Sequence, residues 1–186
     1  MQDTTIISKV FDWYLMNVMP IVEEFAIQPT MGYHGLYTHT AAVVFRGIDY
    51  ATHLNQDPKY VVMACAFHDM ARENDGWDFE HGINAIPMAQ NAMDKIGDIN
   101  DDVRKSIIYA VKEHSVGKIA PDYISACLWD ADRTRLAWEC EYNPMFFNTD
   151  RAKIVASRPA QEYLDFMRKN MSEYARNRIY ALDEFY

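Results

Sequence analysis

The sequence predicts an all-α protein, folded as a single-domain helical bundle of about six to seven helices. Apolar residues recur every three to four positions along most of the chain, which is the period of an α-helix. Glycine and proline, seven of each in 186 residues, are scarcer than their combined average of about 12%. A β-sandwich or barrel needs many turns, so this composition favours helices. The length fits one domain over residues 1–186.

The first three helices follow from periodicity and from residues typical of helix ends. The first is expected over residues 4–25, with a break or kink at Pro20. The second covers about residues 36–54 and has an apolar face. The third begins with Asp57 as N-cap, and Pro58 occupies the first helical position, where a missing N–H group has no cost.

Four more helices follow a polar loop. One spans about residues 83–96, and the next begins near residues 100–102, whose acidic side chains suit the positive end of a helix dipole. That helix is expected to end near His114. Pro121 predicts the start of the sixth helix, and Pro159 lies at the start of the last one.

The charge balance excludes several kinds of partner. Lys and Arg number 18 and Asp and Glu number 27, which gives a net charge of −9. A nucleic-acid polymer or an anionic membrane would favour basic residues, so neither is expected as a partner. The three cysteines show no CxxC spacing, and the first residues show no signal peptide. We therefore expect a cytoplasmic protein.

Several polar residues lie where the helical pattern predicts buried positions. His68, His114 and Asp132 each fall on the apolar stripe of a different predicted helix. Asp69 is adjacent to His68, and His39 lies near the start of the second helix. An unpaired charge at such a position costs several kcal/mol unless it is paired or binds a cation. Imidazole nitrogens together with carboxylate oxygens suit Zn²⁺, Mn²⁺, Fe²⁺ or Ni²⁺.

The order His39, then the pair His68-Asp69, then Asp132 resembles the HD-domain superfamily of metal-dependent phosphohydrolases, which are all-helical proteins. The resemblance covers roughly residues 32–156. It is strongest in AFHDMARENDGWDFEHG and CLWDADRTRLAW, which are similar to a bacterial branch of the superfamily. An adjacent His and Asp alone are a weak signal, whereas the ordered set on agreeing helical stripes is a strong one.

The resemblance implies that four residues ligate a first metal ion: His39, His68, Asp69 and Asp132. Two aspartates compete in the WDAD segment. The pattern of the superfamily favours Asp132, which also shares a stripe with Leu128 and Leu136. Asp130 is then expected to position the helix or to act beside the metal, and a carboxylate without a role is the alternative.

Two more histidines fit a second ion. His81 and His114 lie between the HD pair and the last aspartate, and the resemblance implies that they hold a second metal with Asp69 as the bridge. Alternatively, one or both bind substrate phosphate or donate a proton. His34 lies five residues before His39 and is expected to be peripheral, and a position covering the site is the alternative.

The implied mechanism is hydrolysis by a metal-activated water. The cofactor is a divalent metal, Mn, Fe, Ni, Co, Zn or Mg, as one or two ions. Asp69 or Asp130 orients the water or accepts its proton, and Arg72 and Arg133 are candidate phosphate-binding residues. Several nucleotidases of the superfamily carry an acid three residues after the HD aspartate. Here that position is Arg72, so Glu73 takes the role or none does.

We therefore predict a metal-dependent phosphohydrolase that acts on a phosphoester of a small phosphorylated metabolite or nucleotide. One alternative is a di-iron oxygenase of a small alcohol, because some HD proteins with the same six ligands hold two irons. Another is a non-catalytic binding module. A homodimer is an option, because aromatic stripes lie outside the region of resemblance.

Overall fold

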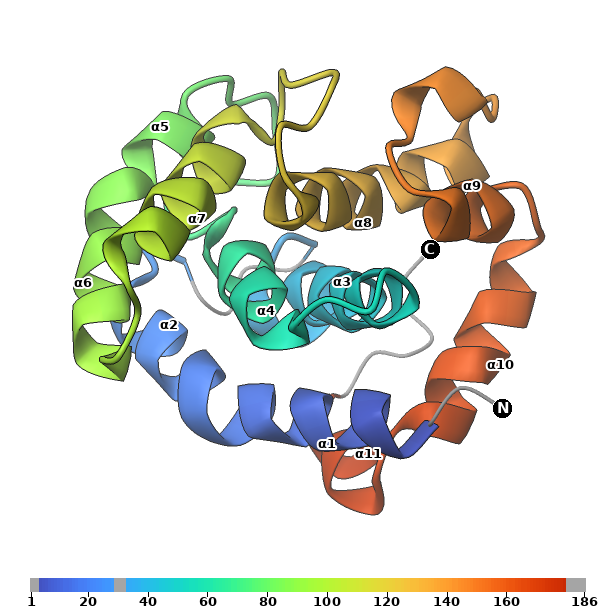
Figure 1. Cartoon of the computed structure of the whole chain (residues 1–186), viewed down its shortest axis with the longest axis horizontal. Coiled ribbons are helices and arrows are strands. Elements are labelled where there is room, and N and C mark those ends of the chain that lie inside the picture. Colours follow the sequence, from blue (N-terminus) through green and yellow to red (C-terminus); the bar gives the residue numbers. More distant parts are fainter. Residues whose placement is uncertain (1–3, 29–32, 180–186) are drawn as a thin grey trace.

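Two central helices, α3 (Ala41–His53) and α4 (Pro58–Phe67), are surrounded by the other helices of the protein (Figure 1). The computed structural model describes residues 4–28 and 33–179. Within those residues every regular element is a helix, and none is a strand, so the all-α prediction is confirmed. The remaining elements are α1 (Thr4–Trp13), η1 (Tyr14–Val18), α2 (Met19–Phe25), η2 (Leu36–Thr40), α5 (His81–Asn84), α6 (Ile86–Ile96), α7 (Asp101–Glu113), α8 (Tyr123–Glu139), η3 (Pro144–Phe146), α9 (Asp150–Ala156), α10 (Ala160–Asn170) and α11 (Glu173–Arg178).

The predicted number of helices is too low. In the described ranges α1, η1 and α2 form one continuous helix, η2 continues into α3, and one residue separates α5 from α6. Apart from the three-residue turn η3, nine helices remain in these ranges. The sequence analysis missed α9, which is only seven residues long. It also missed the division between α10 and α11, where the Ser172 side chain accepts a hydrogen bond from the Ala175 N–H and begins a new helix.

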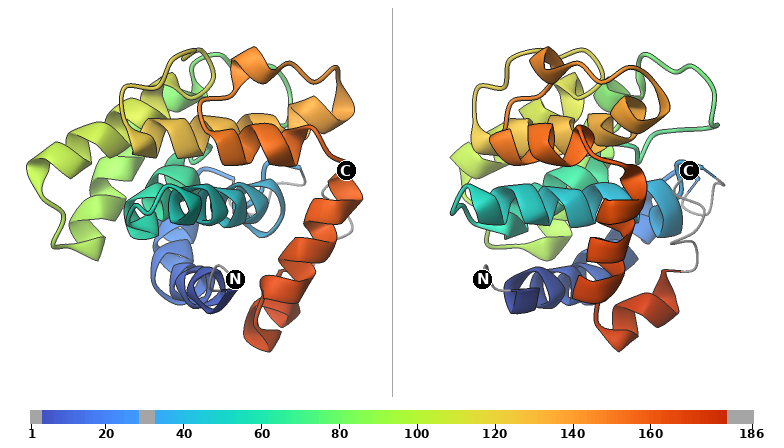
Figure 2. Two further views of the ribbon diagram at one scale, coloured as in Figure 1. Left: turned by 45° about the vertical axis from the view of Figure 1, so that its right-hand side comes forward. Right: turned by 90° about the vertical axis from the view of Figure 1, so that its right-hand side faces the viewer.

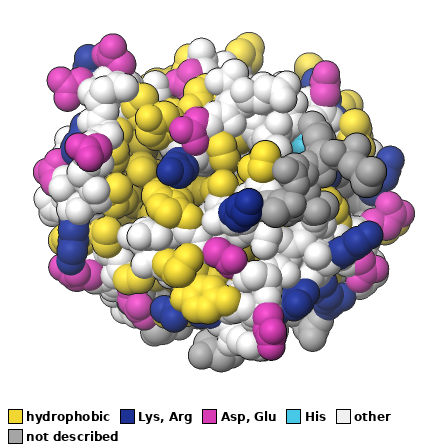
Figure 3. Space-filling view, turned by 60° about the horizontal axis from the view of Figure 1, so that its bottom comes forward, with side chains coloured by type: hydrophobic (Ala, Val, Ile, Leu, Met, Phe, Trp, Pro, Cys, Tyr) yellow, Lys and Arg dark blue, Asp and Glu magenta, His cyan; other side chains and the backbone are white. Residues whose placement is uncertain are grey.

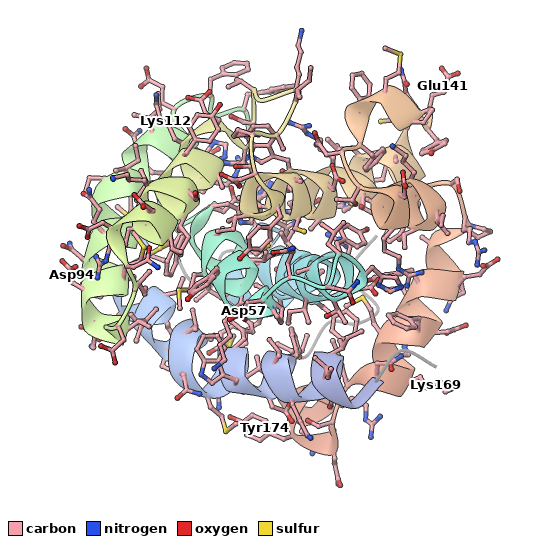
Figure 4. All side chains as sticks on the ribbon, in the orientation of Figure 1. Asp57, Asp94, Lys112, Glu141, Lys169 and Tyr174 are labelled. Carbon is pink, nitrogen blue, oxygen red and sulfur yellow. The ribbon has the colours of Figure 1, made fainter. Side chains whose placement is uncertain are left out.

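Most of the predicted helix starts are confirmed. Asp57 caps α4 by accepting a hydrogen bond from the Lys59 N–H, and Asn100 caps α7 in the same way. Asp57 is labelled at the start of α4 in Figure 4. Pro20 lies in the first turn of α2, directly after the π-helical segment η1. Helix α8 begins two residues after Pro121, because the Asp122 side chain is its N-cap.

The helices α6 and α7 lie on one side of the α3–α4 pair and α10 lies on the other (Figure 2). Helix α8 packs against both central helices, and side chains fill the spaces between the layers (Figure 4). Every residue from Ala41 to Ala51 is buried, so α3 is the centre of the core. Leu136 is an exception to the predicted stripe of α8, because it is 57% exposed.

A glycine allows the two central helices to approach closely. A Cβ atom on Gly47 of α3 would lie 2.7 Å from the Cys65 sulfur and 2.9 Å from a methyl carbon of Val61, both on α4. The two helices form a hairpin, so the start of α3 lies beside the end of α4. This arrangement brings His39 and His68 together.

The face formed by α1 and α2 carries several hydrophobic side chains between isolated charged ones (Figure 3). Ile6 and Met16 are exposed there, at 42% and 56%. This face neither confirms nor excludes the predicted homodimer, which stays a prediction. Among the helices of the described ranges, none combines the length and the apolar character that crossing a membrane requires.

Candidate metal centre

Six side chains from the ends or inner faces of five helices meet beside the central pair. His39 comes from η2, His68 and Asp69 follow α4, His81 begins α5, His114 follows α7, and Asp132 lies on α8. All are buried except Asp132, whose side chain is 23% exposed. The structure therefore brings together the six residues that the sequence analysis chose as metal ligands.

Three of the histidines are held by the same local contact. The Nδ1 atoms of His68 and His114 lie 2.7 Å from the carbonyl oxygens of Cys65 and Val111, three residues earlier in each case. The Nδ1 atom of His81 makes the equivalent contact with the Asp78 carbonyl. A carbonyl oxygen only accepts hydrogen bonds, so each Nδ1 carries the proton. In the neutral ring, Nε2 is then left with a free lone pair, as in a metal ligand.

The first group of candidate ligands surrounds His39. Its Nε2 atom lies 3.0 Å from Asp132 Oδ1, 3.3 Å from His68 Nε2 and 3.8 Å from Asp69 Oδ2. The His68 Nε2 atom is also 3.2 Å from Asp69 Oδ2. Three helices thus direct two nitrogens and two oxygens at one point.

The second group lies on the other side of Asp69. Its Oδ1 atom is 3.2 Å from His81 Nε2 and 3.8 Å from His114 Nε2, and these two nitrogens are 2.7 Å apart. The Asp69 carboxylate therefore faces one group with each oxygen, which is the arrangement expected of a bridging ligand.

Both groups suit a metal ion. Nitrogen and oxygen ligands lie about 2.0–2.2 Å from Zn²⁺, so neighbouring ligand atoms are about 3.0–3.5 Å apart in tetrahedral or octahedral coordination. Four of the eight distances between ligand atoms lie in this range, and the other four lie between 2.7 and 3.9 Å. Two imidazole nitrogens that face each other with lone pairs repel, and a cation between or beside them removes that repulsion.

Both carboxylates of the cluster have lowered pKa values, so they are ionised at neutral pH. Burial alone would raise the pKa of Asp69, but the neighbouring imidazoles of His68 and His81 lower the pKa well below its usual value. Burial would also raise the pKa of Asp132, but the neighbouring imidazoles of His39 and His68 lower it. Two ionised carboxylates in a buried site need positive charge close by.

The pKa values of His68 and His114 are shifted in opposite directions when no metal is bound. Burial favours the neutral form of His68, but the adjacent Asp69 carboxylate outweighs burial and raises the pKa of His68 to about 9. Burial and the charge on His68 lower the pKa of His114 to about 4. In the metal-free protein at neutral pH, His68 therefore holds a proton at the place where the first group would bind a metal.

Gly82 lets α5 approach the end of α7. A Cβ atom at this position would lie 2.9 Å from the carbonyl oxygens of Val111 and Lys112, and 3.2 Å from the His114 ring. Any larger residue would separate the two helices. The glycine after His81 thus permits the 2.7 Å approach of the His81 and His114 nitrogens.

A cavity of about 620 Å³ opens onto the cluster. Five of the six candidate ligands line it, and His68 lies behind them. Two exposed aromatic rings, Trp77 and Phe79, also line the cavity and stack on each other with their centroids 5.8 Å apart. The sequence analysis assigned these two residues no role, although exposed aromatic residues in the loop after an HD pair were visible in the sequence.

Arg72 and Arg133, the predicted phosphate-binding residues, line the cavity, but two nitrogens of each already have partners. Arg72 donates from Nε to Asp69 Oδ1 at 3.0 Å and from Nη1 to the Gly76 carbonyl at 3.1 Å. The Arg133 guanidinium donates to the backbone carbonyls of His114, Gly117 and Phe146. Arg72 therefore orients Asp69, and Arg133 holds the loop after α7 against α8.

Asp130 and Glu73 lie apart from the cluster. The Asp130 carboxylate is fully buried and accepts hydrogen bonds from the backbone N–H groups of Asn148 and Thr149 and from the Asn148 side chain. These partners occupy oxygens for which the sequence analysis allowed a catalytic role, so Asp130 anchors the start of α9 instead. Glu73 is exposed and does not line the cavity.

His34 is closer to the site than predicted. Its ring lines the cavity, packs 5.3 Å from the His39 ring centroid, and bonds through Nδ1 to Asp75 Oδ1 at 2.9 Å. Asp75 also accepts the backbone N–H groups of Tyr33 and His34. These contacts tie the segment before η2 to the loop after α4, which spacing along the chain does not reveal.

Comparison with known proteins supports the fold. No protein-family profile and no curated protein matches the chain. Among solved structures, the chain is similar to the crystal structure of a predicted HD superfamily hydrolase from an uncultured Thermotogales bacterium. The two chains are 21% identical, the match covers 84% of this chain and 90% of the other, and the TM-score is 0.61. This protein therefore has an HD-type all-helical fold.

Metal binding is expected to release protons. At pH 7 the pKa of about 9 keeps His68 protonated in the metal-free protein, whereas a metal ligand must be neutral. We predict that binding of Zn²⁺ or Mn²⁺ releases about one proton per ion at the first group. Calorimetric titration in two buffers of different ionisation enthalpy measures that number.

The matched control is His53→Ala, which changes a histidine outside the cavity and should leave the proton count unchanged. A binding enthalpy that is the same in both buffers would mean that no proton leaves, which contradicts a protonated His68 at this position.

Proposed function

We propose that the protein is a metal-dependent phosphohydrolase that cleaves a phosphoester of a small phosphorylated metabolite or nucleotide. The observation that carries the proposal is the placement of Asp69 between two groups of inward-facing histidine nitrogens at the base of an open cavity. The fold shared with a predicted HD superfamily hydrolase supports it.

The first group would hold one divalent ion through four residues: His39, His68, Asp69 and Asp132. The second group would hold another through Asp69, His81 and His114. A divalent ion bound there would neutralise phosphoryl charge and lower the pKa of a coordinated water to about 7. The metal is Mn, Fe, Ni, Co, Zn or Mg, because nitrogen and oxygen ligands are compatible with each of these.

The residues of the chain prepare this chemistry in separate ways. The carbonyl contacts of His68, His81 and His114 fix the tautomer, so that Nε2 faces the cluster. Arg72 fixes the Asp69 carboxylate by a hydrogen bond to Oδ1. The Asp132 carboxylate is partly exposed and lines the cavity, where it can accept a hydrogen bond from the attacking water and orient it.

The cavity matches a small substrate. Its volume of about 620 Å³ lies within the range of about 300–1,000 Å³ that is usual for small-molecule sites. The net charge of −9 and the acidic residues Asp75, Asp78 and Glu139 at the cavity disfavour an extended polyanion.

A screen of phosphorylated metabolites with added Mn²⁺, Ni²⁺, Co²⁺, Fe²⁺ and Mg²⁺ tests the function. We predict phosphate release that a chelator abolishes and that falls at least about a hundredfold in His68→Ala and Asp69→Ala, because either change removes a ligand of the first ion. The matched controls are His53→Ala and Asp165→Ala, which lie outside the cavity and should retain activity.

Chelator-insensitive hydrolysis would contradict the proposal. Stoichiometric iron with an O₂-sensitive visible spectrum and no phosphatase activity would favour the second candidate, a di-iron oxygenase. The six-ligand set with Asp69 between its two halves is the observation that keeps this candidate open. A folded protein with bound metal and no turnover on either class would indicate a binding module.

The second group predicts a second ion. Replacing His81 and His114 together by Ala removes both nitrogens on the Oδ1 side of Asp69 and leaves the first group intact. We predict that the metal content falls from two ions per chain to one and that turnover falls at least about tenfold, because one ion can still polarise a water.

Elemental analysis of the wild type and the double variant gives the metal content, with His53→Ala as the control. A wild-type content of one ion, unchanged in the double variant, would return His81 and His114 to substrate binding or to a structural role.

A further inference from the structure

Arg135 lines the same cavity as the metal cluster, and the sequence analysis did not consider it. It lies three residues after Asp132 on α8, and residues at this spacing share a face of a helix. Asp132 and Arg135 both line this cavity.

The Arg135 side chain is only 14% exposed, yet two of its three nitrogens lack a partner. The atoms Nε and Nη1 are shielded from water and make no hydrogen bond within the described residues. Only Nη2 is paired, with Glu139 Oε1 one turn further along α8. Buried donors without acceptors are costly, so a shift of the side chain that brings these donors to the acceptors of a ligand gains affinity.

The orientation of the Arg135 guanidinium is fixed from one side. Its central carbon lies 3.7 Å from the centroid of the Tyr33 ring, which covers one face of the planar group. Tyr33 is itself held by Asp75, which accepts its backbone N–H at 3.3 Å. A guanidinium that is stacked and paired loses little freedom when it binds a further group.

The other arginines of the cavity are already paired through two nitrogens each. Arg72 bonds to Asp69 and the Gly76 carbonyl, and Arg133 bonds to three backbone carbonyls. Among the residues described as lining the cavity, Arg135 is the arginine whose unpartnered donors are shielded from water.

We propose that Arg135 is the substrate-binding arginine, and that its Nε and Nη1 groups donate hydrogen bonds to phosphoryl oxygens of the substrate. This proposal rests on the proposed phosphohydrolase function for the identity of the anion. It assigns recognition of the phosphoryl group to Arg135, and it leaves to Arg72 and Arg133 the structural contacts that they already make.

Binding of inorganic phosphate to the Mn²⁺-loaded protein tests the proposal. We predict that Arg135→Gln, which removes the charge and the two donors, weakens phosphate binding at least about tenfold by calorimetry. Arg135→Lys keeps the charge but lacks the planar guanidinium group, so its phosphate affinity should lie between those of the wild type and Arg135→Gln. The matched control is Arg158→Gln, which changes an exposed arginine outside this cavity that pairs with Glu162.

Metal content and thermal unfolding are measured for each variant, because Arg135 is not a metal ligand and neither should change much. If Arg135→Gln is poorly folded, the proposal is tested with Arg135→Lys, for which we expect phosphate affinity to fall at least about threefold. Phosphate affinity within twofold of the wild type in the folded variants would overturn the proposal. No phosphate binding by the wild type at about 10 mM, a concentration far above common substrate KM values, would also overturn it.

The outcomes separate this proposal from the proposed function. Phosphate binding that depends on Arg135, in a protein that hydrolyses no phosphoester, keeps the anion site and removes the phosphohydrolase. Hydrolysis with a KM that is the same in the wild type and in Arg135→Gln keeps the phosphohydrolase and removes the role of Arg135. Acetate that displaces phosphate at equal concentration would overturn the phosphoryl assignment and indicate a carboxylate ligand.

Discussion

The arrangement of the site depends on the Asp69 carboxylate, which is buried with an imidazole nitrogen near each of its oxygens. A buried carboxylate is unfavourable without positive charge, and facing imidazole lone pairs repel each other. In the metal-free protein a proton on His68 meets part of this requirement, as the pKa of about 9 indicates. A divalent ion in each group would meet it more fully, since imidazole and carboxylate ligands, four in the first group and three in the second, suit such an ion.

The fold places these residues by bringing helix ends together. The hairpin of α3 and α4, packed closely at Gly47, brings the start of one helix beside the end of the other. Gly82 does the same for α5 and α7. Because each histidine after a helix bonds to the carbonyl three residues earlier, the backbone of the helix end sets the direction of the ring. Residues at helix ends are thus positioned by the packing of the helices and by one local hydrogen bond each.

Much of this arrangement was predictable from the sequence, and the predictable part is the one that depends on local pattern. Helical stripes placed His68, His114 and Asp132 at inward positions, and cap residues such as Asp57 located helix starts. The short helix α9 was missed, because seven residues give too few turns for a period to appear. Leu136 extended the apparent stripe of α8 but lies beside the open cavity and is exposed.

The roles of the arginines and of Asp130 depend on contacts between distant segments, which a single sequence does not show. Arg133 resembles a phosphate-binding residue by position, but the loop after α7 supplies carbonyl acceptors for it. Asp130 meets the Asn148–Thr149 backbone, and Arg135 meets a tyrosine about a hundred residues away. In each case the side chain's partner, and not its own position, decides what it is free to do.

The most direct test of the metal centre is anomalous X-ray diffraction from crystals of the protein soaked in Mn²⁺. The account predicts two anomalous peaks, one beside each oxygen of Asp69: the first among His39, His68 and Asp132, and the second between His81 and His114. Crystals with bound manganese elsewhere on the surface, and with no peak within coordination distance of Asp69, would contradict the central claim.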